Sequence, residues 1–165
     1  MQRLEEYKLQ LNKRTDKGEF WWELRPCAYN QYFEECKIVW AETSLGNQFC
    51  IVEGGVYLNK TSFMIPSKDL TLLAILNSKL VKFYLDSIVS KVRGGYFSMS
   101  KAYVETIPII YPDNPFPFSE KAEMIIESKK GNPSSDTTAL ESQIDQLVYQ
   151  LYNLTPEEIK IVEGS

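Results

Sequence analysis

The densest run of apolar positions along the chain lies between residues 70 and 89. Its leucine, isoleucine, valine and aromatic side chains fall on almost every side of a helix with 3.6 residues per turn. A helix that is apolar all round is buried, so we expect this one to pack against a sheet. Ser67 stands shortly before the run and is a favourable N-cap residue, which predicts the start of the helix.

Shorter apolar runs on either side predict the strands of that sheet. Residues rich in β-branched and aromatic side chains occur at 37–40, 49–52, 56–58, 61–65 and 103–110. The glycines of Glu53-Gly54-Gly55 favour a hairpin between the second and third of these runs. A proline-rich segment at 111–118 is too irregular for a helix or strand and marks a boundary.

Helical patterns dominate both ends of the chain. An amphipathic helix is predicted at 3–14, and three more follow the boundary at 119–129, 138–151 and 155–162. Thr138 with Glu141, and Thr155 with Glu158, have the spacing of capping boxes. The whole pattern predicts an α+β fold: a small mixed sheet packed on a long buried helix, followed by a helical C-terminal tail.

Length and composition are typical of one globular domain, with 165 residues and 44% hydrophobic side chains. No apolar stretch reaches the length of a membrane span, and the N-terminus is polar, so we expect a cytoplasmic protein with no membrane partner. The cysteines Cys27, Cys36 and Cys50 lack metal-ligand spacing. They are expected to be small buried side chains in a reducing compartment.

Several kinds of catalytic chemistry are excluded by composition. The chain has no histidine, which removes histidine-activated nucleophiles and histidine zinc sites, and no glycine-rich nucleotide fingerprint occurs. Asn114-Pro115-Phe116 lacks the second proline of the Asn-Pro-Pro-aromatic methyltransferase motif and is taken as a linker. Asp113 with Glu158 could form a magnesium-binding nuclease pair, but the helix cap explains Glu158. We therefore predict no catalytic residue, no metal site and no cofactor in this chain.

Charge is distributed unevenly along the chain. The net charge is −4, yet residues 1–102 hold 14 Lys/Arg against 11 Asp/Glu, whereas residues 103–165 hold 4 against 11. Such asymmetry indicates a basic working part and an acidic part that faces solvent or a protein.

The basic part is concentrated around a pair of glycines, Gly94 and Gly95. From residue 79 to residue 101, five cations are accompanied by one carboxylate, Asp86. The cations are Lys79, Lys82, Lys91, Arg93 and Lys101. Cations, hydroxyls and exposed rings around a sharp turn suit a nucleic-acid backbone. A solvated turn explains the stretch equally well when it is taken alone, and a solvated helix face is preferred for Lys79 and Lys82.

Several separated blocks resemble a known family, the TaqI-like C-terminal specificity domain. The blocks are 21–27, 37–39, 57–61, 73–80, 93–96 and 107–109, and the ending at 139–159 is similar to the tail of many adenine-specific methyltransferases. The resemblance implies a DNA target-recognition domain at 19–118, a linker helix at 1–18 from an absent N-terminal catalytic domain, and a helical tail at 119–165. In the parent enzyme, with or without a fused nuclease, that catalytic domain would bind S-adenosylmethionine.

The implied partners are double-stranded DNA and the methyltransferase domain of the same polypeptide. Lysines and Arg93 would contact phosphates, while the glycine turn and nearby hydroxyls would contact bases. The candidate contact residues are Lys37, Lys60, Thr61, Ser62, Lys91, Arg93, Gly94, Gly95, Tyr96, Ser98 and Lys101. Two alternatives stay open: a protein-interaction module that docks a partner through the apolar stripe of the helix at 138–151, and an independent nuclease.

Overall fold

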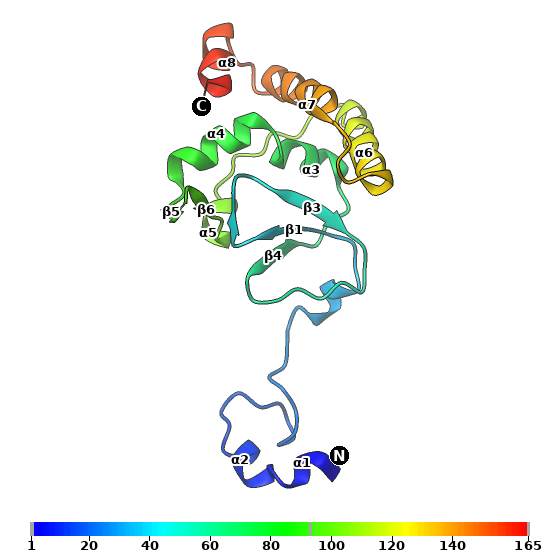
Figure 1. Ribbon diagram of the computed structural model, residues 1–165, viewed down its shortest axis with the longest axis vertical. Helices are drawn as coiled ribbons and strands as arrows, with labels where there is room; N and C mark the ends of the chain where they lie inside the picture. The colour runs from blue at the N-terminus through cyan, green and yellow to red at the C-terminus, as the bar shows by residue number, and fades with distance from the viewer. Residues whose placement is uncertain (1, 93, 165) are drawn as a thin grey trace.

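The computed structural model describes residues 2–92 and 94–164, which form two small sheets, a layer of helices and a separate N-terminal segment (Figure 1). The N-terminal segment contains the short helices α1 (Gln2–Glu5) and α2 (Lys8–Asn12) in place of one continuous helix, and it lies away from the sheets. A one-turn 3-10 helix, η1 (Asn30–Phe33), precedes the first strand. No helix in the described part of the chain is long and apolar enough to cross a bilayer.

Both sheets are antiparallel, which corrects the expected mixed sheet. The first has the order β3-β1-β4, with strands β1 (Lys37–Ala41), β3 (Phe49–Val52) and β4 (Ser62–Ile65). The second has the order β2-β6-β5, with strands β2 (Thr43–Ser44), β5 (Lys91–Val92) and β6 (Tyr96–Ser98). Trp40 lies opposite Phe49 on one side and Phe63 on the other, which fixes the register of the first sheet.

The long buried helix is divided into α3 (Leu70–Leu76) and α4 (Lys79–Ile88). Asn77 ends α3, and Ser78 begins α4 by accepting a hydrogen bond from the N–H of Val81. The N-cap of α3 is Asp69, whose carboxylate accepts hydrogen bonds from two backbone amides of the first turn, and Ser67 instead accepts one from the Asp69 N–H. The prediction of Ser67 as the cap was wrong because Asp69 is closer to the first turn.

Three helices follow; the first two pack onto the same core as the sheets, and the third lies against α4. They are α6 (Phe116–Gly131), α7 (Thr138–Leu151) and α8 (Pro156–Glu163). Phe118 and Val148, which are 4% and 0% exposed, belong to one apolar cluster with Ile38 and Ile75. Ile144 on α7 is buried in this cluster as well. Ile144 and Val148 of the apolar stripe are therefore taken up by the chain's own core, while Leu140, Leu147 and Leu151 are partly exposed.

The tail is also joined to α4 by a polar contact. The carboxylate of Asp145 on α7 accepts a hydrogen bond of 2.8 Å from the backbone N–H of Lys79, at the first turn of α4. The capping box of Thr155 and Glu158 is confirmed at the start of α8. At α7 the N-cap is Thr137, one residue before the predicted position, and its hydroxyl donates to the carboxylate of Glu141.

Two predicted strands are wrong. Residues 56–58 form no strand, so the predicted hairpin between 49–52 and 56–58 does not form. Instead β3 pairs with β1, and the other edge of β1 pairs with β4, which follows a longer loop. The predicted strand at 103–110 is replaced by the short helix α5 (Lys101–Val104) and an irregular segment. The hydroxyl of Tyr152 accepts a hydrogen bond from Ile110 N–H and donates one to the Pro108 carbonyl, so a side chain replaces a neighbouring strand. Cys27 and Cys50 are exposed rather than buried.

Candidate nucleic-acid interface

The glycine pair forms the turn of the β5–β6 hairpin. Gly94 and Gly95 have φ values of +89° and +80°, a region that side chains with a Cβ rarely adopt. The N–H of Gly95 donates to the carbonyl of Val92 at 3.1 Å and closes the turn. Both glycines and Tyr96, which is 40% exposed, face solvent. The predicted sharp turn is confirmed, while Arg93 lies outside the described residues.

The cations beside this turn are paired with carboxylates. Lys91 forms an ion pair with Asp86, and its ammonium lies 5.7 Å from the centre of the Phe97 ring. The hydrogen bond from Lys91 lowers the pKa of Asp86 below its ordinary value. Lys101 pairs with Glu105 at 3.1 Å. Both lysines are solvent-exposed, and exposed pairs contribute about 0–1 kcal/mol, so either lysine can exchange its carboxylate for a phosphate.

A second group of predicted contacts lies in the loop before β4. The carboxamide oxygen of Asn59 accepts hydrogen bonds from the backbone N–H of Thr61 at 3.1 Å, the hydroxyl of Thr61 at 2.8 Å and the hydroxyl of Ser62 at 3.2 Å. These bonds fix the loop in one conformation, in which Lys60 and Thr61 are exposed. The hydroxyl oxygens remain free to accept hydrogen bonds from outside the chain.

Glu42 joins this loop to the end of β6. Its N–H donates to the Thr61 carbonyl at 2.8 Å, and its carbonyl accepts from the N–H of Met99 at 2.7 Å. The indole N–H of Trp40 donates to the carbonyl of the same Met99 at 2.8 Å. The structure therefore brings Thr61 and Ser62 beside Ser98, although 36 residues separate Ser62 from Ser98 in the sequence. The junction of these segments is called the sheet junction below.

Lys37 has no access to a ligand. Its side chain is 0% exposed, and its ammonium donates to the carbonyls of Phe33, Glu35 and Glu53 at 2.9, 2.8 and 3.3 Å. All three of its N–H groups are used, so the predicted phosphate contact is wrong. Lys37 instead holds the 3-10 helix η1 and the start of the β3–β4 loop together. The buried neighbours Ile38 and Val39 were the sequence signal for this burial.

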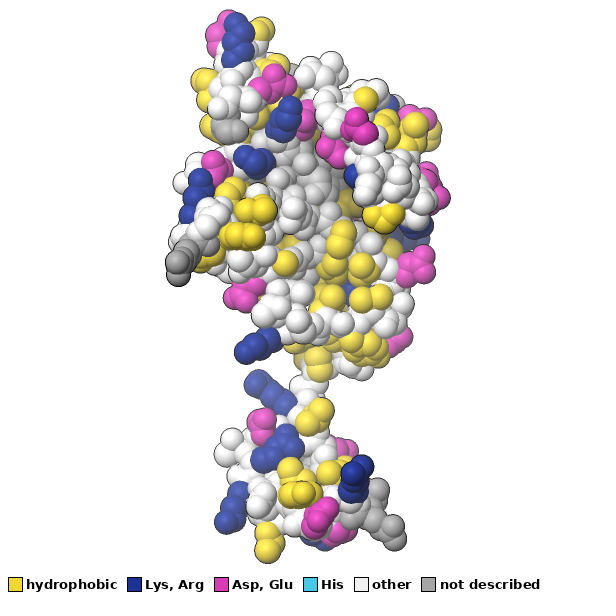
Figure 2. Space-filling view, viewed as in Figure 1, with side chains coloured by type: hydrophobic (Ala, Val, Ile, Leu, Met, Phe, Trp, Pro, Cys, Tyr) yellow, Lys and Arg dark blue, Asp and Glu magenta, His cyan; other side chains and the backbone are white. Residues whose placement is uncertain are grey.

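Figure 2 shows lysine and arginine side chains along the flank formed by α4 and β5, and on the N-terminal segment. Apolar side chains gather instead over the first sheet and the helices beside it. The predicted lysines other than Lys37 are thus on the surface, at the hairpin and at the sheet junction. Sequence reasoning did not single out Glu42, whose backbone joins the two surface segments, because those bonds link residues that are far apart in the sequence.

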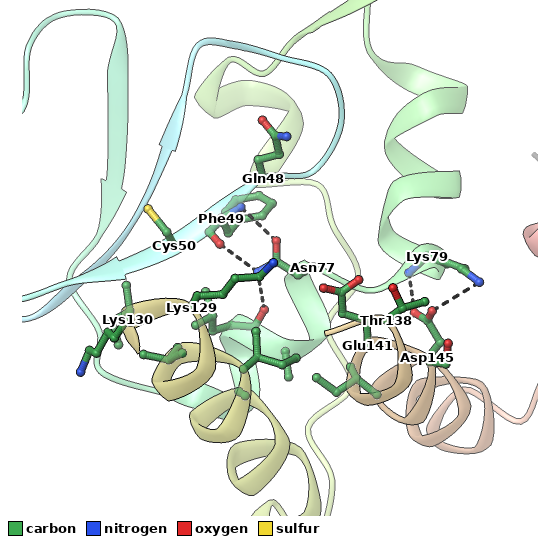
Figure 3. A pocket seen from close by; sticks show the side chains of 18 residues that line it. Gln48, Phe49, Cys50, Asn77, Lys79, Lys129, Lys130, Thr138, Glu141 and Asp145 are labelled. Carbon is green, nitrogen blue, oxygen red and sulfur yellow. Dashed lines mark hydrogen bonds and ion pairs between the residues drawn. The ribbon is translucent and has the colours of Figure 1, made fainter. Parts of the chain in front are cut away.

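A cavity of about 800 Å³ lies on another side of the molecule, between β3 and the helices α3, α6 and α7 (Figure 3). Most of its wall is apolar, and the polar side chains Asn77, Lys79, Glu141 and Asp145 lie along it. Burial raises the pKa of Asp145 despite the opposing effect of Lys79. Lys79, Lys129 and Lys130 line the wall together with the carboxylates of Glu141 and Asp145, so charges of both signs face the cavity. In the described part of the chain, no three potential metal ligands lie together.

Residues 4–109 match the TaqI-like C-terminal specificity domain family. The match includes both sheets, the glycine turn and the sheet junction. The chain belongs to this family. No curated protein matches the chain. Membership in a specificity-domain family supports a role in DNA recognition.

The family match of this TaqI-like specificity domain ends at residue 109, before α6 begins. The hydrophobic core of the domain continues into α6. Phe118 and Ala122 of α6 are buried in the same cluster as Leu73 and Ala74 of α3. The hydroxyl of Thr71 also donates to the carbonyl of Pro115 at 3.1 Å. Helices α6 and α7 therefore share the core of the matched segment, although the family match does not include them.

Proposed function

We propose that this chain is the DNA target-recognition domain of an adenine-specific DNA methyltransferase of a restriction-modification system. The observation that carries the proposal is the family match, because it includes the two surface segments at 59–62 and 91–101 that supply the candidate contacts. The backbone bonds of Glu42 support it further, since they hold the first of these segments against the end of β6.

In this proposal the lysines provide sequence-independent contacts. Lys60, Lys91 and Lys101 are exposed and would neutralise phosphates on either side of the sheet junction. The exposed backbone of Gly94 and Gly95 allows close approach to the duplex, because no side chain stands between the turn and its ligand. Arg93 is proposed as a further phosphate contact on the basis of the sequence alone.

Base contacts are assigned to the side chains between these lysines. Thr61, Ser62, Ser98 and the ring of Tyr96 are the candidates from sequence that the structure leaves on the surface or partly exposed. A separate catalytic domain, preceding residue 1 in the parent protein, would bind S-adenosylmethionine, which supplies the methyl group. That domain would also flip out the target adenine, while the chain described here sets the register on the duplex.

Titration of the chain with a fluorescent duplex at several salt concentrations tests the proposal. Three lysine–phosphate contacts predict that the logarithm of the affinity falls with the logarithm of salt with a slope of about −2 to −3. Lys60→Gln should weaken binding and make this slope shallower by about 0.9. Lys160→Gln on α8 is the matched control and should change neither value. Binding that is absent at low salt would contradict the proposed function.

A further inference from the structure

The strand β3 forms one edge of the first sheet, and the backbone of Ile51 on this edge is unpaired. The side chain of Asn77 is bonded to both the N–H and the carbonyl of Phe49, so these groups of Phe49 point away from β1. In an antiparallel strand the polar groups of every second residue point to the same side. The N–H and carbonyl of Ile51 therefore point away from β1 as well, and nothing in the described ranges 2–92 and 94–164 bonds to them.

The cavity between β3 and the helices lies along this free edge. Phe49, Cys50 and Ile51 all line it, although the side chain of Cys50 is on the opposite face of the sheet from the other two. A cavity lined by residues of both faces borders the edge of a strand. Its opposite wall is apolar and includes Leu73 of α3 and Ile125 of α6. The part of the cavity bounded by Ile51 and Ile125 is called the edge groove below.

Two lysines stand beside the edge groove. In Figure 3, Lys129 and Lys130 of α6 lie on the Cys50 side of Asn77, which is the side towards the free edge. Lys130 pairs with Glu127 of its own helix at 3.2 Å, and the two side chains are 63% and 65% exposed. Exposed pairs contribute about 0–1 kcal/mol, so Lys130 can bind a carboxylate of another chain instead.

The carboxylates of the cavity lie on the other side of Asn77 and already have partners. Asp145 accepts a hydrogen bond from the N–H of Lys79, and Glu141 accepts one from the hydroxyl of Thr137. Beside the free edge, the charged side chains that line the cavity are therefore positive. An occupant of the edge groove needs backbone groups for Ile51, apolar side chains for the wall and a negative charge for the lysines.

We propose that the edge groove binds an extended acidic peptide segment of a partner protein, which pairs with Ile51 as an added strand of the first sheet. In strand addition, main-chain hydrogen bonds provide affinity, and contacts to alternate side chains provide specificity. Alternate side chains of the segment are apolar and face Leu73 and Ile125, and a carboxylate meets Lys130. A second copy of this chain fits less well, because β3 carries no charged side chain to meet the lysines.

Selection from a library of random ten-residue peptides displayed on phage tests the proposal on the chain as it stands. Enriched peptides should have apolar residues at alternate positions and an Asp or Glu close to them. A fluorescein-labelled peptide of the consensus sequence should bind the chain in solution. N-methylation of its backbone, one residue at a time, should weaken binding about five- to tenfold at the residue that donates to Ile51 and little at the two neighbours.

Variants of the chain separate strand addition from adhesion to an apolar surface. Ile51→Pro removes the free N–H and should weaken binding about fivefold. Met64→Pro is the matched control, since the same alternation places the N–H of Met64 at the outer edge of β4, and it should bind as wild type does. Lys130→Glu should weaken binding about three- to tenfold, whereas Lys160→Glu on α8 should not change it.

The N-methylated peptides and Lys130→Glu give a result without any change inside β3. If no peptide with this pattern is enriched, or if the peptide series and Lys130→Glu both bind as the unmodified pair does, the proposal is overturned. It is also overturned if sedimentation shows a dimer that Ile51→Pro dissociates, because a second copy then occupies the edge. Duplex DNA is absent from all of these measurements, so their failure leaves the proposed function standing.

Discussion

The side-chain amide of Asn77 pairs with the backbone of Phe49 as a neighbouring strand would. Its carboxamide oxygen accepts from Phe49 N–H at 3.0 Å, and its NH₂ group donates to the Phe49 carbonyl at 2.9 Å. Phe49 is in β3, an edge strand of the first sheet, and Asn77 is the residue that ends α3. One side chain thus covers part of a sheet edge and breaks a helix.

Asn77→Ala should lower the free energy of unfolding by about 2–3 kcal/mol, because the substitution leaves a partly buried N–H and C=O without partners. Urea unfolding measured by tryptophan fluorescence would give the difference. Asn12→Ala is a suitable control, since no described bond involves the side chain of Asn12. If the two variants were equally stable, the hydrogen bonds between Asn77 and Phe49 would contribute nothing to the free energy of unfolding.

Lys37→Met should destabilise the fold by about 2–4 kcal/mol, since three carbonyls lose a charged donor. Lys60→Met should leave the stability within about 0.5 kcal/mol of wild type, because the side chain is exposed. The affinity of the Lys60→Met variant for duplex DNA should fall instead. Chemical unfolding and duplex titration of both variants would separate the roles. If the Lys37→Met protein were as stable as wild type but bound DNA more weakly, Lys37 would be a DNA contact after all.

Gly95→Ala should cost about 1–2 kcal/mol of stability through the backbone alone, since an added Cβ meets no atom within 4 Å at that position. The same change at Gly131, which ends α6 with a different backbone conformation, should be neutral or stabilising by up to about 1 kcal/mol. Thermal unfolding of the two variants measures this contrast. If both substitutions had equal effects, the positive φ at Gly95 would not matter for folding.

The pH dependence of stability should reveal the buried carboxyl of Asp145. Burial raises its pKa above the ordinary value of 3.8, so the folded state binds more protons than the unfolded state, and stability falls as pH rises from below 3.8 through the folded pKa. Asp145→Asn abolishes this titration, and its carboxamide oxygen can still accept from Lys79 N–H. The stability of the variant relative to wild type should therefore increase as pH rises from below 3.8 through the folded pKa of Asp145.

Asp86 is a suitable control, because its effect on stability should change with pH in the opposite direction to that of Asp145. The hydrogen bond from Lys91 lowers the pKa of Asp86 in the folded state, so its contribution is present above 3.8 and is lost as pH falls through the folded pKa. The free energy of unfolding of Asp86→Asn relative to wild type should therefore decrease as pH rises towards 3.8. Urea unfolding at several pH values measures both variants, and a shift in the same direction for both would contradict the assignment.

The sequence predicted the parts of the fold that local chemistry determines. The buried helical region, the cap at Thr155 and the turn at Gly94–Gly95 follow from periodicity, hydroxyl placement and glycine pairing. The break at Asn77 does not, because its cause is a strand 28 residues away. Lys37 was misassigned for the same reason, since the carbonyl of Glu53 that it binds lies 16 residues further on.

The candidate interface was predicted from clustered cations, hydroxyls and the glycine pair, which are visible in a sequence. The arrangement of its segments was not, because the backbone of Glu42 joins them through bonds to Thr61 and Met99, which are distant in sequence. The segment at 103–110 has the composition of a strand, but Tyr152 supplies the hydrogen bonds that a neighbouring strand would otherwise provide.

The core that the sheets share with α6 and α7 determines which piece of the chain can be exchanged as a unit. A chimera that exchanges only residues 4–109 would transfer Leu73 and Ala74 without the helix that covers them. Exchange of residues 30–164 keeps α3 with α6 and the N–H of Lys79 with Asp145. A graft of this specificity domain should therefore be cut before η1 and after α8.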